Sequence, residues 1–227
     1  MTRRNNDDFV LLNRFKGRLL NHLTSADRTG SVSVIEEALR YNCTPASIYN
    51  SVITPAMVDL GELWHGGRIT IAHEHHASQI VDDLINMVVQ KSQRLSLNGL
   101  RALVTSPSGE NHCIGAKIFA NLLFLEGWDV EYLGPDTPAE DLTKYLMEIE
   151  VDVVALSVVL PGNIPSVMGA VSSIESLENP PFVILGGPAF KGFSDEIGTA
   201  AIADNSTTGL TVLQDAMGIG AGHLSLR

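Results

Sequence analysis

The sequence predicts an α + α/β protein: a four-helix bundle over residues 1–97, followed by a flavodoxin-like (Rossmann-type) doubly wound parallel sheet over residues 98–227. Two observations carry this prediction. As far as about residue 95, apolar residues recur at helical spacing. From Leu100 onward, short apolar runs alternate with helical segments, and glycine or proline separates them. Such alternation is typical of a parallel sheet whose helices cover both faces.

Four helices are expected in the first part, joined by short connections as in a small bundle. They are predicted over Asp8–Ser25, around Val34–Asn42, from Thr44 to Trp64, and from Thr70 to about Leu95. Pro45 suits the first position of the third helix, because a proline there lacks only an N–H that no helical carbonyl needs. Pro55 lies inside that helix and is expected to kink or restart it.

The second part is expected to hold five strands, each followed by a helix. The strands are predicted at Leu100–Val104, Asp129–Leu133, Val153–Leu156, Phe182–Leu185 and Ala200–Ala203. The helices are predicted at Cys113–Leu125, Pro138–Glu148, Ile164–Leu177, Lys191–Ile197 and Thr208–Met217. In the loop before the second of these helices, Asp136 or Thr137 is expected to cap the helix.

Composition excludes several classes of function. The 227 residues carry a formal net charge of −11, which argues against nucleic-acid binding through a basic face. No apolar run approaches the roughly 20 residues that span a bilayer, and the first eight residues lack the apolar core of a signal peptide. Two cysteines, Cys43 and Cys113, are too few for a disulfide framework. We therefore expect a soluble cytoplasmic protein with free thiols.

The stretch Ser106–Gly115 carries the first chemical motif, Glu-x-His-x-x-Gly, in the turn after the first predicted strand. Ligands bind at the carboxyl ends of strands in open α/β sheets. His112 can offer a neutral imidazole nitrogen to a metal, and Glu110 is near enough to hold the other ring nitrogen. Gly115 has no Cβ, so a wide ligand can approach the backbone there. A helix cap or an ordinary surface histidine is the alternative for His112.

Two further strand ends match this motif. Ser157-Val158-Val159 ends one predicted strand, and Gly186-Gly187 ends the next. Together, the three elements resemble the cobalamin-binding domain of methionine synthase, methylmalonyl-CoA mutase and their relatives. The resemblance implies that His112 is the lower cobalt ligand in place of the cofactor's own base. It also implies that Ser157, Val159, Gly186 and Gly187 line the slot for the displaced nucleotide tail. Glu110 and Val159 depart from the family's usual aspartate and leucine.

The second motif lies in the helical part, where four of the seven histidines fall between Trp64 and His76. A zinc site is one interpretation, but the i, i+4 pair of a His-Glu-x-x-His motif is absent. A core tryptophan that closes the bundle is the plain alternative for Trp64. The spacing Trp64, nine residues, then Glu74-His75 resembles that of the CarH-type adenosylcobalamin photoreceptors.

In that family, a four-helix bundle covers the upper face of the corrin. The resemblance implies that Trp64 packs over the adenosyl group, that Glu74 and His75 help to hold it, and that His65 takes the upper cobalt position after photolysis. Those repressors carry an amino-terminal DNA-binding domain, and no basic recognition helix precedes the bundle here. The chain also resembles the stand-alone photocobilins, which add a biliverdin-type bilin. Arg68, His73 and His76 are candidate bilin contacts.

These resemblances lead to a functional hypothesis. We expect a light sensor without enzymatic activity that binds adenosylcobalamin and signals to a partner protein, and biliverdin is a candidate second chromophore. We expect it to form a homo-oligomer and to bind neither nucleic acid nor membrane directly. The alternative is a corrinoid protein that carries a methyl group for a methyltransferase system, since such proteins resemble the chain over nearly its full length. A third interpretation is a module that signals cobalamin supply without light.

Overall fold

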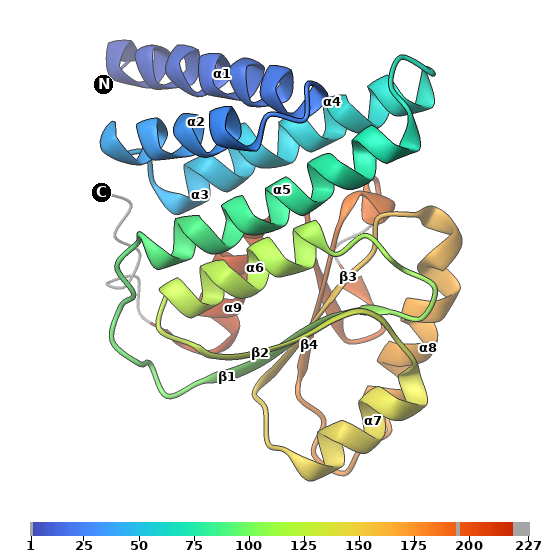
Figure 1. Cartoon of the computed structure of the whole chain (residues 1–227). Coiled ribbons are helices and arrows are strands. Elements are labelled where there is room, and N and C mark those ends of the chain that lie inside the picture. The colour runs from blue at the N-terminus through green and yellow to red at the C-terminus, as the bar shows by residue number, and fades with distance from the viewer. Residues whose placement is uncertain (1, 194–195, 220–227) are drawn as a thin grey trace. The chain divides into compact units, whose positions relative to one another are not determined.

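The computed structural model describes residues 2–193 and 196–219 and divides the chain into two units (Figure 1). A helical unit runs to Ser92, and an α/β unit begins at Gln93. The α + α/β fold class predicted from the sequence is confirmed. The segment 93–97, assigned to the bundle from the sequence, packs within the α/β unit. There the Arg94 side chain donates to the carbonyls of Phe124 and Trp128 at 3.0 and 2.7 Å.

The helical unit consists of helices joined by short turns. In chain order these are α1 (Thr2–Thr24), α2 (Arg28–Arg40), α3 (Pro45–Ile48), the π-helical segment η1 (Tyr49–Ile53), α4 (Thr54–His65) and α5 (Ile71–Gln90). Each helix turns an apolar stripe inward, as the sequence period requires. Fully buried side chains from this stripe include Phe15, Leu19, Ile35, Leu60, Ile80 and Leu84. Burying each one contributes about 1.5–3 kcal/mol before the entropy of ordering is counted.

Pro55 restarts the third helix, which is one of the two outcomes that the sequence predicted: the α-helix α4 begins at Thr54, with Pro55 in its first turn. The segment before it, η1, keeps the chain helical, and the Thr54 N–H bonds to the Tyr49 carbonyl, five residues back. A proline cannot donate to the carbonyl four residues before it. A single wide turn shifts the hydrogen-bond pairing just ahead of Pro55, which suits that missing donor. The buried Tyr49 hydroxyl donates to the Ile85 carbonyl at 2.9 Å and ties this turn to α5.

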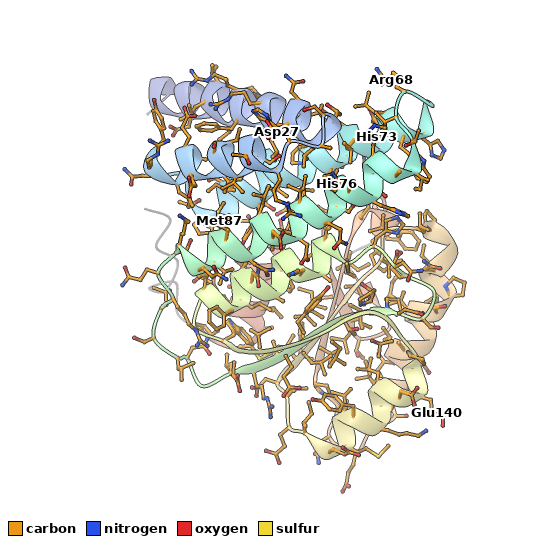
Figure 2. All side chains as sticks on the ribbon, in the orientation of Figure 1. Asp27, Arg68, His73, His76, Met87 and Glu140 are labelled. Carbon is orange, nitrogen blue, oxygen red and sulfur yellow. The ribbon has the colours of Figure 1, made fainter. Side chains whose placement is uncertain are left out.

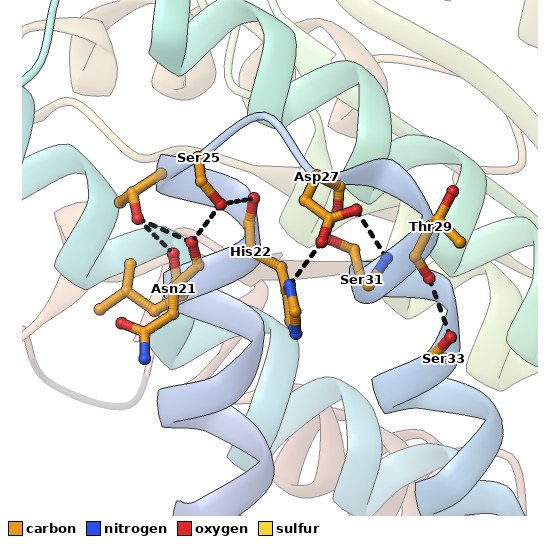
Figure 3. Close-up of polar contacts among 10 residues, drawn as sticks. Asn21, His22, Ser25, Asp27, Thr29, Ser31 and Ser33 are labelled. Carbon is orange, nitrogen blue, oxygen red and sulfur yellow. Dashed lines mark hydrogen bonds and ion pairs between the residues drawn. The ribbon is translucent and has the colours of Figure 1, made fainter.

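A polar cluster in the turn between α1 and α2 is a structural cap (Figure 3). Asp27 is the N-cap of α2 and accepts from the Gly30 N–H at 2.9 Å. Its other oxygen lies 2.9 Å from Nδ1 of His22. A Cβ at Gly30 would overlap both side chains, so this position requires glycine. The hydrogen bond from Gly30 lowers the pKa of Asp27 below its ordinary value.

The α/β unit is built around one sheet. Its strands are β1 (Arg101–Pro107), β2 (Asp129–Thr137), β3 (Val153–Ser157), β4 (Phe182–Gly186), β5 (Glu196–Ile197) and β6 (Ala200–Ala203). The order is β2-β1-β3-β4-β6-β5, and every pair except β5 with β6 is parallel. The chain leaves β1 toward β2 and then returns to β3 on the other side. The carboxyl ends of β1 and β3 therefore form the switch point where such sheets bind ligands.

Helices cover both faces of this sheet. They are α6 (Ile114–Leu125), α7 (Ala139–Glu148), α8 (Ile164–Glu175) and α9 (Ser206–Ala216), with short 3₁₀ turns η2 (Pro161–Asn163) and η3 (Pro188–Phe190). Figure 1 shows α7 beside α8 on one face and α6 with α9 on the other. Buried residues of β3, β4, α7 and α8, such as Val154, Leu185, Leu142 and Val171, form a shared core on the first face.

One predicted helix is wrong. The region predicted as Lys191–Ile197 begins just after η3 and holds a turn and the short strand β5, apart from residues 194–195, which lie outside the described range. Gly192 and Gly198 have φ values of 87° and 63°, and glycine is the residue that adopts such angles without strain. These two glycines bracket the segment and account for the absence of a regular helix.

Candidate functional site

The turn after β1 brings the first motif to the switch point. The Glu110 N–H donates to the Pro107 carbonyl at 3.0 Å, which closes a four-residue turn. Gly109, the third residue of this turn, has a φ of 84°. A positive φ at that position defines a type II turn, which favours glycine. The turn projects Glu110 into the interior and leaves His112 near the surface, just ahead of α6.

Glu110 is fully buried and saturated with hydrogen-bond donors. Oε1 accepts from the His112 N–H at 3.0 Å, and Oε2 accepts from the N–H groups of Val159 and Leu160 at 2.9 and 3.0 Å and from Nδ2 of Asn163 at 3.1 Å. Burial alone raises the pKa of this carboxyl group, but these hydrogen bonds outweigh it and lower the pKa to about 2. Glu110 is therefore a carboxylate throughout the physiological pH range.

His112 is held in one tautomer by this carboxylate. Nδ1 lies 2.6 Å from Oε1 of Glu110. Because an ionised carboxylate can only accept, Nδ1 carries the proton and donates it. In the neutral ring Nε2 then carries the lone pair, and because the side chain is 54% exposed, this nitrogen can reach a metal. The helix-cap alternative for His112 is wrong, because Cys113 is the N-cap of α6. The exposed ring is compatible with both a surface histidine and a metal ligand.

The other predicted residues gather at the same edge of the sheet. Ser157 pairs with Gly186 at the carboxyl ends of β3 and β4. A Cβ at Gly115 would lie 3.7 Å from Oγ of Ser157, so the first turn of α6 faces this strand end. Val159 belongs to the site through its backbone N–H, which Glu110 binds. The α/β unit therefore brings Glu110, His112, Gly115, Ser157, Val159, Gly186 and Gly187 to one edge.

The two adjacent glycines have different roles, and substitution can separate them. Gly187 has a φ of 109°, and a Cβ there would overlap the Val158 carbonyl. We expect Gly187→Ala to lower the free energy of unfolding by about 3 kcal/mol, as measured by chemical denaturation. A Cβ at Gly186 would meet nothing closer than the Ala203 carbonyl at 3.9 Å. Gly186→Ala should therefore leave stability within about 0.5 kcal/mol. Equal losses in the two variants would contradict this assignment.

In the helical unit, Trp64 and His65 end α4 at a Schellman motif. The Arg68 N–H donates to the Leu63 carbonyl and the Gly67 N–H to the Trp64 carbonyl, both at 2.9 Å, and Gly67 has a φ of 68°. This pair of bonds is the standard glycine-dependent helix stop. The Trp64 side chain is 41% exposed, and its ring meets the His65 ring edge to face at 6.0 Å. Trp64 is therefore not a core residue of the helical unit.

The first turns of α5 carry the remaining histidines. Nδ1 of His73 lies 2.7 Å from the Thr70 hydroxyl and accepts from the Thr70 N–H at 3.4 Å. Thr70 is thus the N-cap of α5, and His73 is the N3 residue of its capping box. Glu74 accepts from the Ser78 hydroxyl at 2.7 Å and lies 3.7 Å from Nε2 of the exposed His75. Figure 2 shows Arg68 in the preceding loop and His73 and His76 on α5.

A zinc site in this region gains no support. Within residues 2–193 and 196–219, no three His, Cys, Asp or Glu side chains are grouped so that they could hold a metal ion. The short loop between α4 and α5 instead brings Trp64 and His65 to the same end of the helical unit as Glu74 and His75.

Within residues 2–193 and 196–219, no helix is long and apolar enough to cross a bilayer.

Sequence reasoning missed two residues of the site. Asn163 follows Ser157 by only one loop and binds both the Gly109 carbonyl and the Glu110 carboxylate. Asp136 was expected to cap α7, but the N-cap of that helix is Pro138, and Asp136 binds the Gly109 N–H at 2.7 Å instead. Thr137, the other expected cap, pairs through its hydroxyl with Thr105 at 2.7 Å. The sequence signal that could have identified Asp136 and Asn163 is their position: they are polar residues near the carboxyl ends of β2 and β3, the strands on either side of β1.

Comparison with known proteins agrees with this geometry. Residues 16–88 and 100–210 match two family models, each described as a B12 binding domain. Dimethylamine corrinoid protein 1 of Methanosarcina acetivorans is 22% identical over 200 residues, covering 85% of this chain and 94% of that protein. The HTH-type transcriptional repressor CarA of Myxococcus xanthus is 37% identical over 94 residues, covering 41% of this chain and 32% of that protein.

A solved structure shares the fold. The monomethylamine corrinoid protein of Methanosarcina barkeri aligns with a TM-score of 0.70 at 18% sequence identity, covering 90% of this chain and 99% of that one. The succession of a helical region and a parallel α/β sheet is therefore the corrinoid-protein fold. The matched ranges of the two B12 binding domains contain Trp64, Glu74, His75 and the Glu-x-His-x-x-Gly motif.

Proposed function

Because the chain belongs to the cobalamin-binding proteins, we propose that it is a corrinoid carrier whose His112 is the lower cobalt ligand and that it serves a separate methyltransferase. The observation that carries the proposal is the Glu110–His112 pair, in which a buried and permanently ionised carboxylate keeps Nε2 of the imidazole available. The bound corrinoid would supply a cobalt centre able to hold a methyl group. The protein would hold that centre and have no catalytic activity of its own.

The residues at the sheet edge fit such a cofactor. A neutral imidazole is a good ligand for a first-row transition metal, and the carboxylate of Glu110 on its other ring nitrogen fixes its orientation. Because Gly115 has no Cβ, and a Cβ there would lie 3.7 Å from Oγ of Ser157, a ligand can approach the backbone beside this hydroxyl. Among the residues that the structure describes, the buried Ser106 hydroxyl has no hydrogen-bond partner, so a polar group of a bound cofactor would satisfy it.

The similarity to dimethylamine corrinoid protein 1 supports the carrier function, since it extends over 85% of this chain and nearly all of that protein. The shared region includes both units rather than the cofactor domain alone. On this proposal the output is a protein–protein encounter with the methyltransferase, without direct contact with nucleic acid or membrane. A homo-oligomer and a cytoplasmic location remain predictions from the sequence.

A light sensor is the second candidate, and one observation favours it. Trp64, His65, Glu74 and His75 lie at one end of the helical unit, with the indole exposed and available to a ligand. The 37% identity to a segment of CarA, which is named a transcriptional repressor, supports a regulatory role rather than light sensing itself. In this case the chain would bind adenosylcobalamin in the dark, with His65 as the upper ligand after photolysis and biliverdin as a possible second chromophore near Arg68 and His76. The response would pass to a partner protein.

Titration in the dark separates the two functions. The protein is mixed with methylcobalamin or with adenosylcobalamin, and the absorption spectrum gives the affinity for each. A carrier is expected to bind methylcobalamin at least as tightly as adenosylcobalamin. Tighter binding of adenosylcobalamin, together with a spectral change under green light that persists in the dark, would select the sensor. No binding of either form would contradict both functions.

Trp64→Ala tests the role of the helical unit in either case. If the indole packs over the upper ligand, the variant should bind cobalamin but lose about tenfold of its discrimination between the methyl and adenosyl forms, because about 1–2 kcal/mol of aromatic packing is removed. Phe9→Ala is the matched control, since Phe9 is also an exposed aromatic residue of this unit. Unchanged discrimination in Trp64→Ala would remove Trp64 from the site.

A further inference from the structure

Asp136 adopts a backbone conformation that few residues tolerate. Its φ is 57°, in the left-handed region, and it lies near the end of β2, between Gly134 and α7. Aspartate and asparagine enter this region more readily than other side chains, yet the conformation still has an energetic cost. Such a conformation persists where surrounding contacts require it. Its side chain and its backbone N–H both bond to the turn that carries His112.

Two hydrogen bonds join Asp136 to consecutive residues of that turn. Its Oδ1 accepts from the Gly109 N–H at 2.7 Å, and its own N–H donates to the Glu110 carbonyl at 3.1 Å. The positive φ lets the side-chain oxygen and the backbone N–H of one residue serve neighbouring peptide groups. The register between β1 and β2 shifts at Thr105 and again at Pro107, which carries the end of β2 up to the turn.

The opposite side of the turn is held by the loop after β3. Asn163 donates to the Gly109 carbonyl at 3.3 Å and to the Glu110 carboxylate at 3.1 Å, and the Val159 and Leu160 N–H groups bind the same carboxylate. Because β1 lies between β2 and β3 in the sheet, the turn after β1 is hydrogen-bonded on one side by the end of β2 and on the other by the loop after β3. The β3 side holds the side chain of Glu110, while Asp136 holds its backbone.

We propose that Asp136 is a positioning residue for the lower cobalt ligand. Asp136 holds the peptide groups of Gly109 and Glu110 and so fixes the backbone from which the Glu110 side chain extends. The position of the Glu110 carboxylate in turn orients the imidazole of His112 before any cofactor binds. A ligand that is already oriented loses less freedom when it binds a metal. This inference rests on the proposed function, because the positioning matters for ligation only if His112 binds cobalt.

Two substitutions at this position separate the hydrogen bond from the backbone conformation. Asp136→Asn keeps an acceptor oxygen and a residue type that tolerates a positive φ. Asp136→Gly relieves the conformation but removes the acceptor, so the fold is kept while the bond to the Gly109 N–H is lost. Asp141→Asn, on the exposed surface of α7, controls for the loss of one negative charge in the same unit.

The first measurement uses the protein without cofactor. Amide hydrogen exchange, followed by NMR, is expected to show the Gly109 N–H protected in the wild type and in Asp136→Asn. In Asp136→Gly it should exchange at the rate of an open turn, while the Leu160 N–H stays protected. If the Gly109 N–H stays protected in Asp136→Gly, the positioning role of Asp136 is wrong, whatever affinity for cobalamin is measured.

The second measurement uses hydroxocobalamin. Asp136→Gly should bind it about tenfold more weakly than the wild type, with a larger share of the bound cofactor keeping its own base on cobalt. Asp136→Asn and Asp141→Asn should match the wild type in both respects. If the wild type itself leaves the cofactor's base on cobalt, the proposed function fails. If the wild type shows histidine ligation and Asp136→Gly equals it, only the role of Asp136 is overturned.

Discussion

His112→Ala is expected to bind cobalamin about 100-fold more weakly than the wild type and to leave the cofactor's own base on cobalt. The affinity falls because the variant loses the bond between His112 and cobalt. Substitution of residues that merely support a metal ligand already lowers metal affinity by about 10- to 100-fold. The cofactor's base stays in place because nothing displaces it. Titration followed by the absorption spectrum measures both effects.

His76→Ala is the matched control for that experiment. His76 is an exposed histidine of α5, outside the α/β unit. The His76→Ala protein should bind cobalamin with the affinity and the absorption spectrum of the wild type. A His112→Ala protein whose bound cofactor gives the wild-type spectrum would contradict the assignment of the lower ligand, because the spectrum reports the ligand below cobalt.

Glu110→Gln is expected to lower the free energy of unfolding of the cofactor-free protein by about 3 kcal/mol at pH 7. Glutamine keeps one acceptor oxygen but places an NH₂ group against buried N–H donors that the carboxylate now satisfies. The variant also cannot hold His112 in a single tautomer through a charged partner. Denaturant unfolding measures the loss, and Glu140→Gln on the exposed face of α7 is the control.

The wild type and Glu110→Gln should differ less in their free energy of unfolding at acid pH than at pH 7. The pKa of Glu110 lies at about 2 in the folded chain, below its ordinary value of 4.5. The folded state therefore binds fewer protons than the unfolded state between these values. The stability that the carboxylate contributes is complete above pH 4.5 and is lost as the pH falls toward 2. The gap between wild type and Glu110→Gln should shrink over that interval, and a gap that is constant from pH 6 to 2.5 would show that the charge contributes nothing.

The fold class followed from the sequence because the two periods of apolar residues are local signals. The stripe Phe15, Leu19 and Leu23 is helical by spacing alone, and the runs around Leu103 and Val154 are too short for helices. The predicted helix at Lys191–Ile197 failed because its composition allowed a helix while Gly192 and Gly198 adopt turn conformations. The wide turn ahead of Pro55 depends on hydrogen bonding that the sequence alone does not reveal.

The site was predictable where its residues follow strand ends in a known pattern, as His112, Ser157 and Gly186 do. What the sequence did not reveal is how Glu110 is held. Three of its four donors come from residues about 50 positions away, namely Val159, Leu160 and Asn163. Three of the four, including the nearby His112, donate through backbone N–H groups, which carry no side-chain signal. Asp136 was likewise assigned to the adjacent helix, because a local cap is the common use of an aspartate there.

Cobalt coordination by the protein is the central claim, and electron paramagnetic resonance tests it most directly. The protein is produced with ¹⁵N-labelled histidine, loaded with unlabelled cobalamin, and reduced to the cobalt(II) state. The nitrogen splitting of the cobalt signal is expected to be that of ¹⁵N, and His112→Ala should abolish this ¹⁵N splitting. A splitting from the unlabelled base of the cofactor in the wild-type protein would contradict the account.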